Sequence, residues 1–210
     1  MAKLVFKPGT MLNPVPAVMV SCGVGKEKNI ITIAWTGIIN SAPPMTYISV
    51  RRERHSHHII EAEGEFVINL TTEKLAFAAD YCGVRSGRNE DKFSRLNLTP
   101  AESRVVKCPS IEESPVNIEC RVKETMRLPS HEMFISEIVS VSADEGLMDE
   151  RGRLCLERAG LICYSHGGYF PLKAKSLGRF GFSVMKPKTK KRLAAAGKRG
   201  NSTGPGRRKR

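Results

Sequence analysis

The pattern that most restricts the fold of this chain is an alternation of apolar and polar residues with a period of two. Residues 31–37 alternate in this way, and residues 133–142 repeat the pattern over a longer stretch. Successive side chains of a β-strand point to opposite faces, so this period predicts strands. Further strands are expected at residues 45–50, 65–70, 117–126 and 161–165. The chain is therefore expected to be mainly β.

Two short helices are expected to interrupt these strands early in the chain. Ser56 suits the cap of the first helix, and Gly64 suits its end, where a left-handed residue is favoured. Thr72 suits the cap of a second helix over residues 73–82, which Gly83 would end. Two early helices in an otherwise antiparallel set of strands predict an α+β, mainly β fold: a closed or split β-barrel with peripheral short helices.

The formal net charge of +13 comes almost entirely from the end of the sequence. Residues 186–210 hold 11 of the 34 basic residues and no acidic residue, which leaves 23 basic and 21 acidic residues in positions 1–185. A nearly neutral body gives no charge argument for nucleic-acid binding. We expect one domain over residues 1–185, followed by a basic, disordered tail over 186–210.

No signal for export or membrane insertion is expected to act in this sequence. The first residues lack the apolar stretch of a signal peptide. Residues 29–50 carry no charge, but two consecutive prolines and several hydroxyl residues argue against a spanning helix. The six cysteines form no Cys-x-x-Cys pair and are interpreted as reduced thiols. These features predict a cytoplasmic protein without membrane contact.

Two motif-like segments are interpreted as ordinary structure. Residues 23–26 read Gly-Val-Gly-Lys but lack the earlier glycine and the following hydroxyl of a phosphate-binding loop, so a turn is expected. His55, His57 and His58 have no second ligand group with zinc-like spacing elsewhere in the sequence. A solvated helix start is expected there, and no metal site.

Two other segments are rich in cations and have the composition of an anion-binding site. The segment 82–93 combines two glycines and a serine with Arg85, Arg88 and Lys92, and the segment 49–54 places three arginines after a strand. Backbone N–H groups of a glycine-containing loop, together with Arg and Lys, can bind a phosphate, and so can a strand end followed by a helix N-terminus. The alternative is a pair of basic surface turns.

These clusters occur in an order that resembles a known family. The segments 29–37, 43–44, 49–51, 64–70 and 82–93 together resemble the flavin reductase-like family, and most of all its flavoredoxin branch. The resemblance covers about residues 12–186. It implies an FMN-binding split-barrel fold and a homodimer in which each subunit holds one FMN non-covalently near the subunit interface.

The resemblance also implies which residues bind the cofactor. The matching positions are Thr32, Ala34, Trp35 and Thr36 beside the isoalloxazine ring, Ser49, Val50 and Arg51 beside the ribityl chain and phosphate, Ser56 at a helix start, and Cys82, Gly83, Ser86, Gly87, Arg88 and Lys92 in the phosphate-side loop. His131 occupies the position associated with the nicotinamide and is the expected catalytic residue.

The sequence departs from the wider family at two places. Ala34-Trp35 replaces an Asn-Ser pair, so flavin contacts there are expected through the backbone, and Pro129-Ser130 replaces the Gly-Asp that precedes the histidine. Other interpretations stay open for three of these residues. Trp35 could be an ordinary core residue, His131 could be an ordinary surface histidine, and Cys82 could serve only in packing.

The expected function is that of an FMN-binding oxidoreductase that takes electrons or hydride from NADH or NADPH. The alternative within the same fold is an electron carrier reduced by a redox protein partner. A third hypothesis, from another class, is nucleic-acid binding through the basic tail. That tail has no aromatic residue to stack on bases, so weak, sequence-independent contact with polyanions is expected at most.

Overall fold

The computed structural model describes residues 1–173, 175–178, 180–187 and 189. Residues 1–174 form one compact unit and residues 175–210 a second, whose described part contains a 3-10 turn at Phe182–Val184. The description below concerns the first unit. The boundary expected at residue 185 and the properties of the tail stay predictions, because residues 188 and 190–210 lie outside the described part of the chain.

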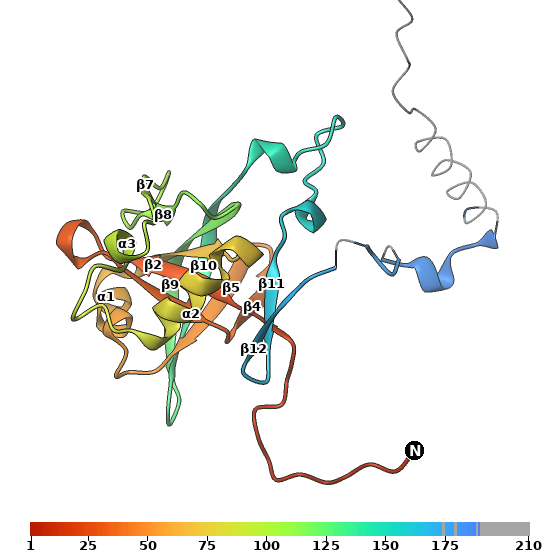
Figure 1. Cartoon of the computed structure of the whole chain (residues 1–210), viewed down its shortest axis with the longest axis horizontal. Coiled ribbons are helices and arrows are strands. Elements are labelled where there is room, and N and C mark those ends of the chain that lie inside the picture. Colours follow the sequence, from red (N-terminus) through yellow and green to blue (C-terminus); the bar gives the residue numbers. More distant parts are fainter. Residues whose placement is uncertain (174, 179, 188, 190–210) are drawn as a thin grey trace, which may run out of the picture. The chain divides into compact units, whose positions relative to one another are not determined.

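The centre of the first unit is an antiparallel sheet of seven strands (Figure 1). Its spatial order is β3-β2-β6-β9-β10-β5-β4. The strands are β2 (Val18–Cys22), β3 (Asn29–Ile33), β4 (Thr36–Ser41), β5 (Pro44–Val50), β6 (Glu65–Leu70), β9 (Val116–Arg127) and β10 (Glu132–Ala143).

The connection between β3 and β4 shows why this sheet is a split barrel. These two strands are at opposite ends of the sheet, yet only Ala34 and Trp35 separate them in sequence. The three residue steps from Ile33 to Thr36 span at most about 11 Å, so the sheet must curl until its ends come together. In the described residues no ladder joins β3 to β4, and the barrel stays open there. The expected mainly β, split-barrel fold is confirmed.

Smaller elements cover the barrel. A three-stranded sheet contains β1 (Val15–Pro16), β11 (Ile162–Ser165) and β12 (Gly168–Pro171), and a two-stranded sheet contains β7 (Pro100–Ala101) and β8 (Ser110–Ile111). The α-helices are α1 (His55–Glu63), α2 (Ala76–Val84) and α3 (Lys92–Arg95). Single 3-10 turns of this unit lie at Gly25–Glu27, Glu73–Leu75, Glu145–Leu147 and Leu156–Arg158. No helix in the described residues is long and apolar enough to cross a membrane.

Two apolar clusters fill the body on either side of β2. Val18 and Val20 point into the barrel with Phe66 and Phe134, whereas Met19 packs on the other side in the cluster that includes α2. Every residue of β2 is buried, so the strand has no polar face. The expected strands therefore did not include it, because a strand covered on both sides does not alternate.

Two expected boundaries change in the structure. The single strand expected at residues 31–37 is divided into β3 and β4, because the chain bends at Ala34 and Trp35. Ser56 does not cap α1: the helix begins at His55, its cap residue is Arg54, and the Ser56 hydroxyl accepts a buried hydrogen bond from Asn29 at 2.9 Å. Gly64 ends α1 with a φ of 69°, as expected.

The second helix starts later and ends later than expected. Residues Glu73–Leu75 form a 3-10 turn, α2 continues to Val84, and Thr72 makes no side-chain capping bond. Gly83 is a helical residue instead of a terminator. A Cβ atom on Gly83 would lie 3.4 Å from the Cβ of Thr32, an ordinary van der Waals distance, so α2 packs directly on β3 at this residue.

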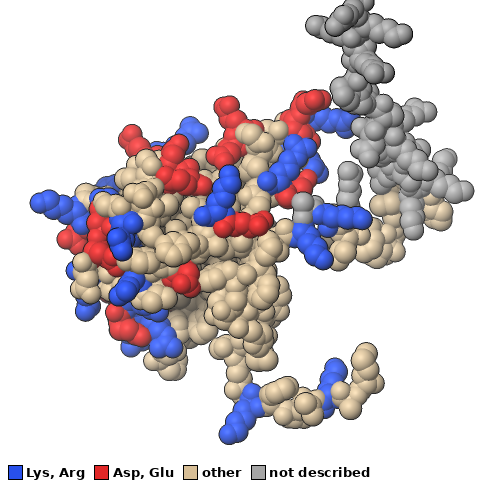
Figure 2. All heavy atoms as spheres, viewed as in Figure 1, with Lys and Arg blue, Asp and Glu red and all other residues tan. Residues whose placement is uncertain are grey.

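The body carries charges of both signs, which Figure 2 shows intermixed over the visible face of the barrel.

One buried carboxylate holds a loop. Glu119 on β9 is 2% exposed and accepts hydrogen bonds from the N–H groups of Arg104 (3.0 Å), Val105 (2.7 Å) and Val106 (3.0 Å). Burial alone would raise the pKa of Glu119, but these N–H donors outweigh it and hold the pKa below its ordinary value of 4.5.

We expect the substitution Glu119→Gln to lower the free energy of unfolding by about 1–3 kcal/mol at pH 7, because an amide cannot accept all three bonds. The carboxylate stabilises the native state above pH 4.5, and this contribution is lost as the pH falls through the lowered native pKa. Urea unfolding of both proteins at pH 7 and pH 3 measures this. A difference between wild type and variant that stays unchanged at pH 3 would contradict the assignment.

Candidate functional site

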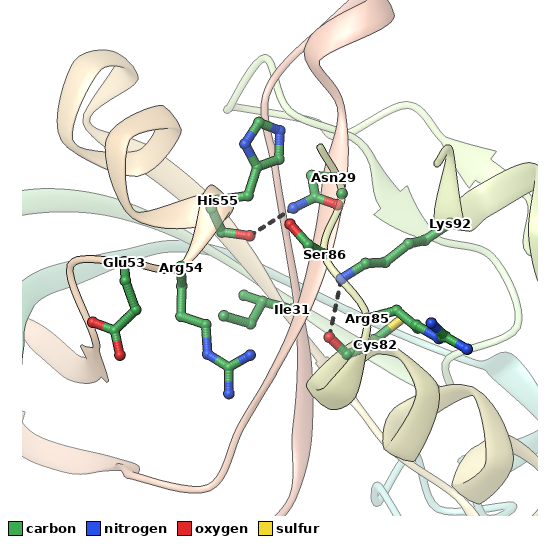
Figure 3. Close-up of a pocket in the computed structure, with 11 residues that line it drawn as sticks. Asn29, Ile31, Glu53, Arg54, His55, Cys82, Arg85, Ser86 and Lys92 are labelled. Carbon is green, nitrogen blue, oxygen red and sulfur yellow. Dashed lines mark hydrogen bonds between the residues drawn. The ribbon is translucent and has the colours of Figure 1, made fainter. Parts of the chain in front are cut away.

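Two adjoining cavities lie where the barrel is open. The first has a volume of about 280 Å³ and the second about 180 Å³, and both are lined by Ile31 and Arg54. They therefore form one groove along β3. The first cavity, here called the phosphate-side cavity, is shown in Figure 3, and its further lining residues are Asn29, Glu53, His55, Ser56, Cys82, Arg85, Ser86, Gly87 and Lys92.

Lys92 is the most unusual residue of the phosphate-side cavity. Its side chain is 3% exposed, and its Nζ donates hydrogen bonds to the carbonyl oxygens of Ile30 (2.7 Å) and Cys82 (3.0 Å; Figure 3). Among the described residues no carboxylate pairs with it. Burial lowers the pKa of Lys92, since the charged form loses its hydration. A buried cation without a counter-ion favours binding of an anion.

The loop after α2 approaches the start of β3 very closely. A Cβ atom on Gly87 would lie 2.2 Å from Oδ1 of Asn29, so any larger residue at this position would displace the Asn29 side chain. Asn29 in turn donates its Nδ2 hydrogen bond to Ser56. The contact joins the α2–α3 loop, β3 and the start of α1 around the cavity, and in Figure 3 Arg54 and Lys92 come from opposite sides of it.

His55 adds a buried polar atom to the lining of this cavity. Its Nδ1 is buried, and no hydrogen bond reaches it from the part of the chain that the structure describes. The pKa of His55 is lowered by burial and by the nearby charges of His58 and Arg88, so the ring is neutral at neutral pH. A neutral imidazole can donate or accept one hydrogen bond at this atom, depending on its tautomer.

The second cavity, here called the ring-side cavity, carries the aromatic groups. Its further lining residues are Thr32, Ile33, Ala34, Trp35, Ser49, Val50, Arg51 and His131. The rings of Trp35 and His131 lie 4.5 Å apart between centroids, and Trp35 is 42% exposed. The Trp35 carbonyl accepts a hydrogen bond from the N–H of Ser49 at 2.9 Å, which fixes the bend between β3 and β4.

The environment of His131 keeps its ring neutral. The residue is buried, and its Nδ1 lies 2.9 Å from the Ser130 hydroxyl. Burial and the charge of Arg51 lower the pKa of His131 below its ordinary value of 6.5. His131 is therefore not a free surface histidine, and Trp35 is not a core residue, so both alternative interpretations are wrong.

Most of the residues expected at the site line this groove. The phosphate-side cavity includes Ser56, Cys82, Ser86, Gly87 and Lys92, and the ring-side cavity includes Thr32, Ala34, Trp35, Ser49, Val50, Arg51 and His131. Three of the expected residues, Thr36, Gly83 and Arg88, do not line the groove. The Thr36 hydroxyl donates a hydrogen bond to the Tyr47 carbonyl, and Gly83 packs on Thr32. The Arg88 side chain is exposed. Burial raises the pKa of the Cys82 thiol to about 11, which supports a packing role.

The groove also contains residues that the sequence did not single out as ligands. They are Asn29, Ile31, Ile33, Glu53, Arg54, His55 and Arg85. Arg54 and Arg85 lie inside the two cationic clusters, so composition pointed to their neighbourhood. Nothing in the sequence distinguishes His55 from its neighbours, because its contribution depends on the position of α1 beside β3.

Comparison with known proteins agrees with this geometry. The model of the flavin reductase-like domain matches residues 11–173. An uncharacterized protein of Archaeoglobus fulgidus is 33% identical over 138 residues, which cover 66% of this chain and 77% of that protein. The chain belongs to the flavin reductase-like family, and its class is that of flavin-associated redox proteins, as the sequence indicated.

Solved structures show the same fold. The flavoredoxin of Desulfovibrio vulgaris (Miyazaki F) is 28% identical with a TM-score of 0.81, and the match covers 88% of this chain and all of that one. An FMN-binding protein from Thermus thermophilus, solved with bound 1-cyclohex-2-enone, is 21% identical with a TM-score of 0.70 and covers 85% of this chain and 98% of that one. The second similarity concerns the fold alone.

Proposed function

We propose that this protein is an oxidoreductase that binds FMN non-covalently in the groove and takes electrons from NADH or NADPH. The observation that carries the proposal is the buried ammonium of Lys92, which pairs with no carboxylate of the described residues, at one end of a groove whose other end is aromatic. FMN has a matching polarity, with a phosphate at one end and a planar ring system at the other. Membership of the flavin reductase-like family supports a flavin as the ligand.

The phosphate-side cavity fits a phosphate ester. Lys92 and Arg54 supply positive charge, Ser56 and Ser86 supply hydroxyl groups, and the buried Nδ1 of His55 lacks a partner within the described residues. Charge-assisted hydrogen bonds of this kind are stronger than neutral ones. The phosphate would therefore compensate the charge of Lys92, which has no carboxylate partner in the described part of the chain.

The ring-side cavity fits the isoalloxazine ring. Trp35 presents an exposed aromatic face, Ala34 leaves room beside it, and Arg51 places a cation at the edge of the cavity. Bound FMN would accept hydride and pass on electrons, so the chain needs to supply position, charge and access. His131, held by Ser130 beside Trp35, is the proposed contact for a nicotinamide.

A flavoredoxin-type electron carrier is the second candidate. The similarity to the flavoredoxin of Desulfovibrio vulgaris supports it, and such a protein would be reduced by a redox protein partner. Both candidates need the same FMN site, and they differ only in the electron donor. All six cysteines carry free thiols, which supports the proposed cytoplasmic location for either one.

Purified protein is expected to be yellow and to release about one FMN per subunit on denaturation. With FMN added, it should oxidise NADH or NADPH well above the background rate. Absorbance at the flavin and nicotinamide bands measures both properties. Flavin binding without oxidation of either nucleotide would favour the carrier, and failure to take up FMN at micromolar concentration would contradict both candidates.

We further propose a homodimer that uses β4 as part of its interface. This strand is at one end of the seven-stranded sheet and exposes Ile38 and Ile39. Exposed apolar side chains on an edge strand favour association with another chain. Because β4 follows Trp35 directly, the interface would lie beside the ring-side cavity.

A further inference from the structure

Glu132, the first residue of β10, is a buried carboxylate with three cationic or imidazole partners. It is 3% exposed, and its Oε2 lies 2.8 Å from Nε2 of His57. Its Oε1 lies 2.9 Å from Nε of Arg52 and 3.3 Å from Nε of Arg127. Glu132 lines neither cavity of the groove.

Two of these partners flank the segment that lines the phosphate-side cavity. Residues 53–56 all line that cavity, Arg52 precedes them, and His57 follows them. The segment is a tight turn, because Arg54 donates its N–H to the Arg51 carbonyl at 3.1 Å and His57 donates to the Arg54 carbonyl at 2.9 Å. One carboxylate therefore holds both ends of this segment.

The same carboxylate is tied to the ring-side cavity. Glu132 directly follows His131, whose carbonyl accepts a hydrogen bond from Leu128 at 2.9 Å. Arg52 closes the connection, since its Nη2 donates to the Leu128 carbonyl at 3.2 Å while its Nε binds Glu132. The turn that carries His131 and the segment that carries Arg54 are thus joined through Arg52 and Glu132.

Glu132 is ionised in this environment. Burial alone would raise its pKa, but the hydrogen bond from His57 and the charges of His57, Arg52 and Arg127 outweigh burial and hold the pKa below the ordinary value of 4.5. A buried carboxylate can accept several hydrogen bonds at once, which a neutral side chain of the same shape cannot.

We propose that Glu132 is a positioning residue that sets the spacing of the two ends of the flavin groove. It acts through Arg52 and His57, and it touches no ligand itself. This inference rests on the proposed binding of FMN. Its consequence is that the loss of this carboxylate lowers flavin affinity and changes the orientation of the ring, beyond its effect on the stability of the fold.

The first test compares Glu132→Gln with Glu119→Gln. Both side chains are almost fully buried carboxylates with three partners, but Glu119 holds a loop that lines neither cavity. Urea unfolding, FMN titration by fluorescence quenching, and visible circular dichroism of the bound flavin are measured for both. We expect both variants to be destabilised, and only Glu132→Gln to bind FMN about tenfold more weakly with an altered flavin dichroism spectrum.

The second test separates the positioning of the segment 53–56 from the general effect of removing a cation beside Glu132. Arg52→Met and Arg127→Met each remove one cation from Glu132, but only Arg52 flanks the segment 53–56 and reaches Leu128. We expect Arg52→Met to reproduce most of the affinity loss and Arg127→Met to leave FMN binding within about twofold of wild type. Equal losses for both would show a general effect of charge and overturn the inference.

The outcomes distinguish this inference from the proposed function. If the wild-type protein binds no FMN, the proposed function fails, and the positioning role fails with it. If the wild type binds FMN and Glu132→Gln binds it equally well with an unchanged dichroism spectrum, only the inference fails. If Glu119→Gln weakens FMN binding as much as Glu132→Gln does, Glu132 has a structural role alone.

Discussion

Replacement of Lys92 by Met is expected to weaken FMN binding by about tenfold to a hundredfold, since a charge-assisted hydrogen bond contributes about 1.5–3 kcal/mol. The ammonium of Lys92 is buried, and its two observed hydrogen bonds go to backbone carbonyls, which leaves its charge without an anion in the described residues. Met keeps most of the length and removes the charge. Isothermal titration or fluorescence quenching measures the change.

Riboflavin, which lacks the phosphate, provides the control for this prediction. The substitution Lys92→Met should change riboflavin affinity much less than FMN affinity, and the difference between the two losses isolates the phosphate contact from any effect on the fold. Equal losses for both ligands would mean that Lys92 supports the cavity wall and does not bind the phosphate.

Arg88→Met is the matched variant within the same loop. The family resemblance implies a phosphate contact for Arg88, but the structure leaves this side chain exposed and outside the cavity lining. An exposed ion pair contributes little because water and salt screen it. We therefore expect a change of less than about threefold, and a loss as large as that of Lys92→Met would place Arg88 on the phosphate.

The substitution Ile38→Asp is expected to shift the protein from dimer to monomer at micromolar concentration. Ile38 is 70% exposed on the edge strand β4. Burial of one Ile contributes about 1.5–3 kcal/mol, and a two-fold symmetric interface contains the residue twice. We expect the dissociation constant to rise at least about a hundredfold, which sedimentation velocity of wild type and variant measures.

Phe77→Asp is the matched control for the interface. Phe77 is 76% exposed on α2 and lines neither cavity, so it offers a similar apolar surface away from β4. It should leave the dimer intact. Dissociation by Phe77→Asp with an intact Ile38→Asp dimer would move the interface to α2, and a monomeric wild type would contradict the proposed homodimer.

Strands with one face in the core and one outside could be predicted from the sequence. β10, whose buried residues alternate with less buried ones, appears almost at the expected residues, and Gly64 ends α1 as expected. Each of these signals is local, since the period of a strand and the left-handed end of a helix depend on a few neighbouring residues. β2 could not be found in this way, because both of its faces are covered.

The sequence alone determined the family, the mainly β fold and the two cationic segments that border the groove. It did not distinguish Lys92 from Arg88, because both are cations in one glycine-containing loop. Only the tertiary structure decided that Lys92 is buried under β3 while Arg88 is exposed, and that Glu132 meets His57 from 75 positions away. The physical reason is that desolvation of a charge depends on which distant segments cover it, and no local pattern records that.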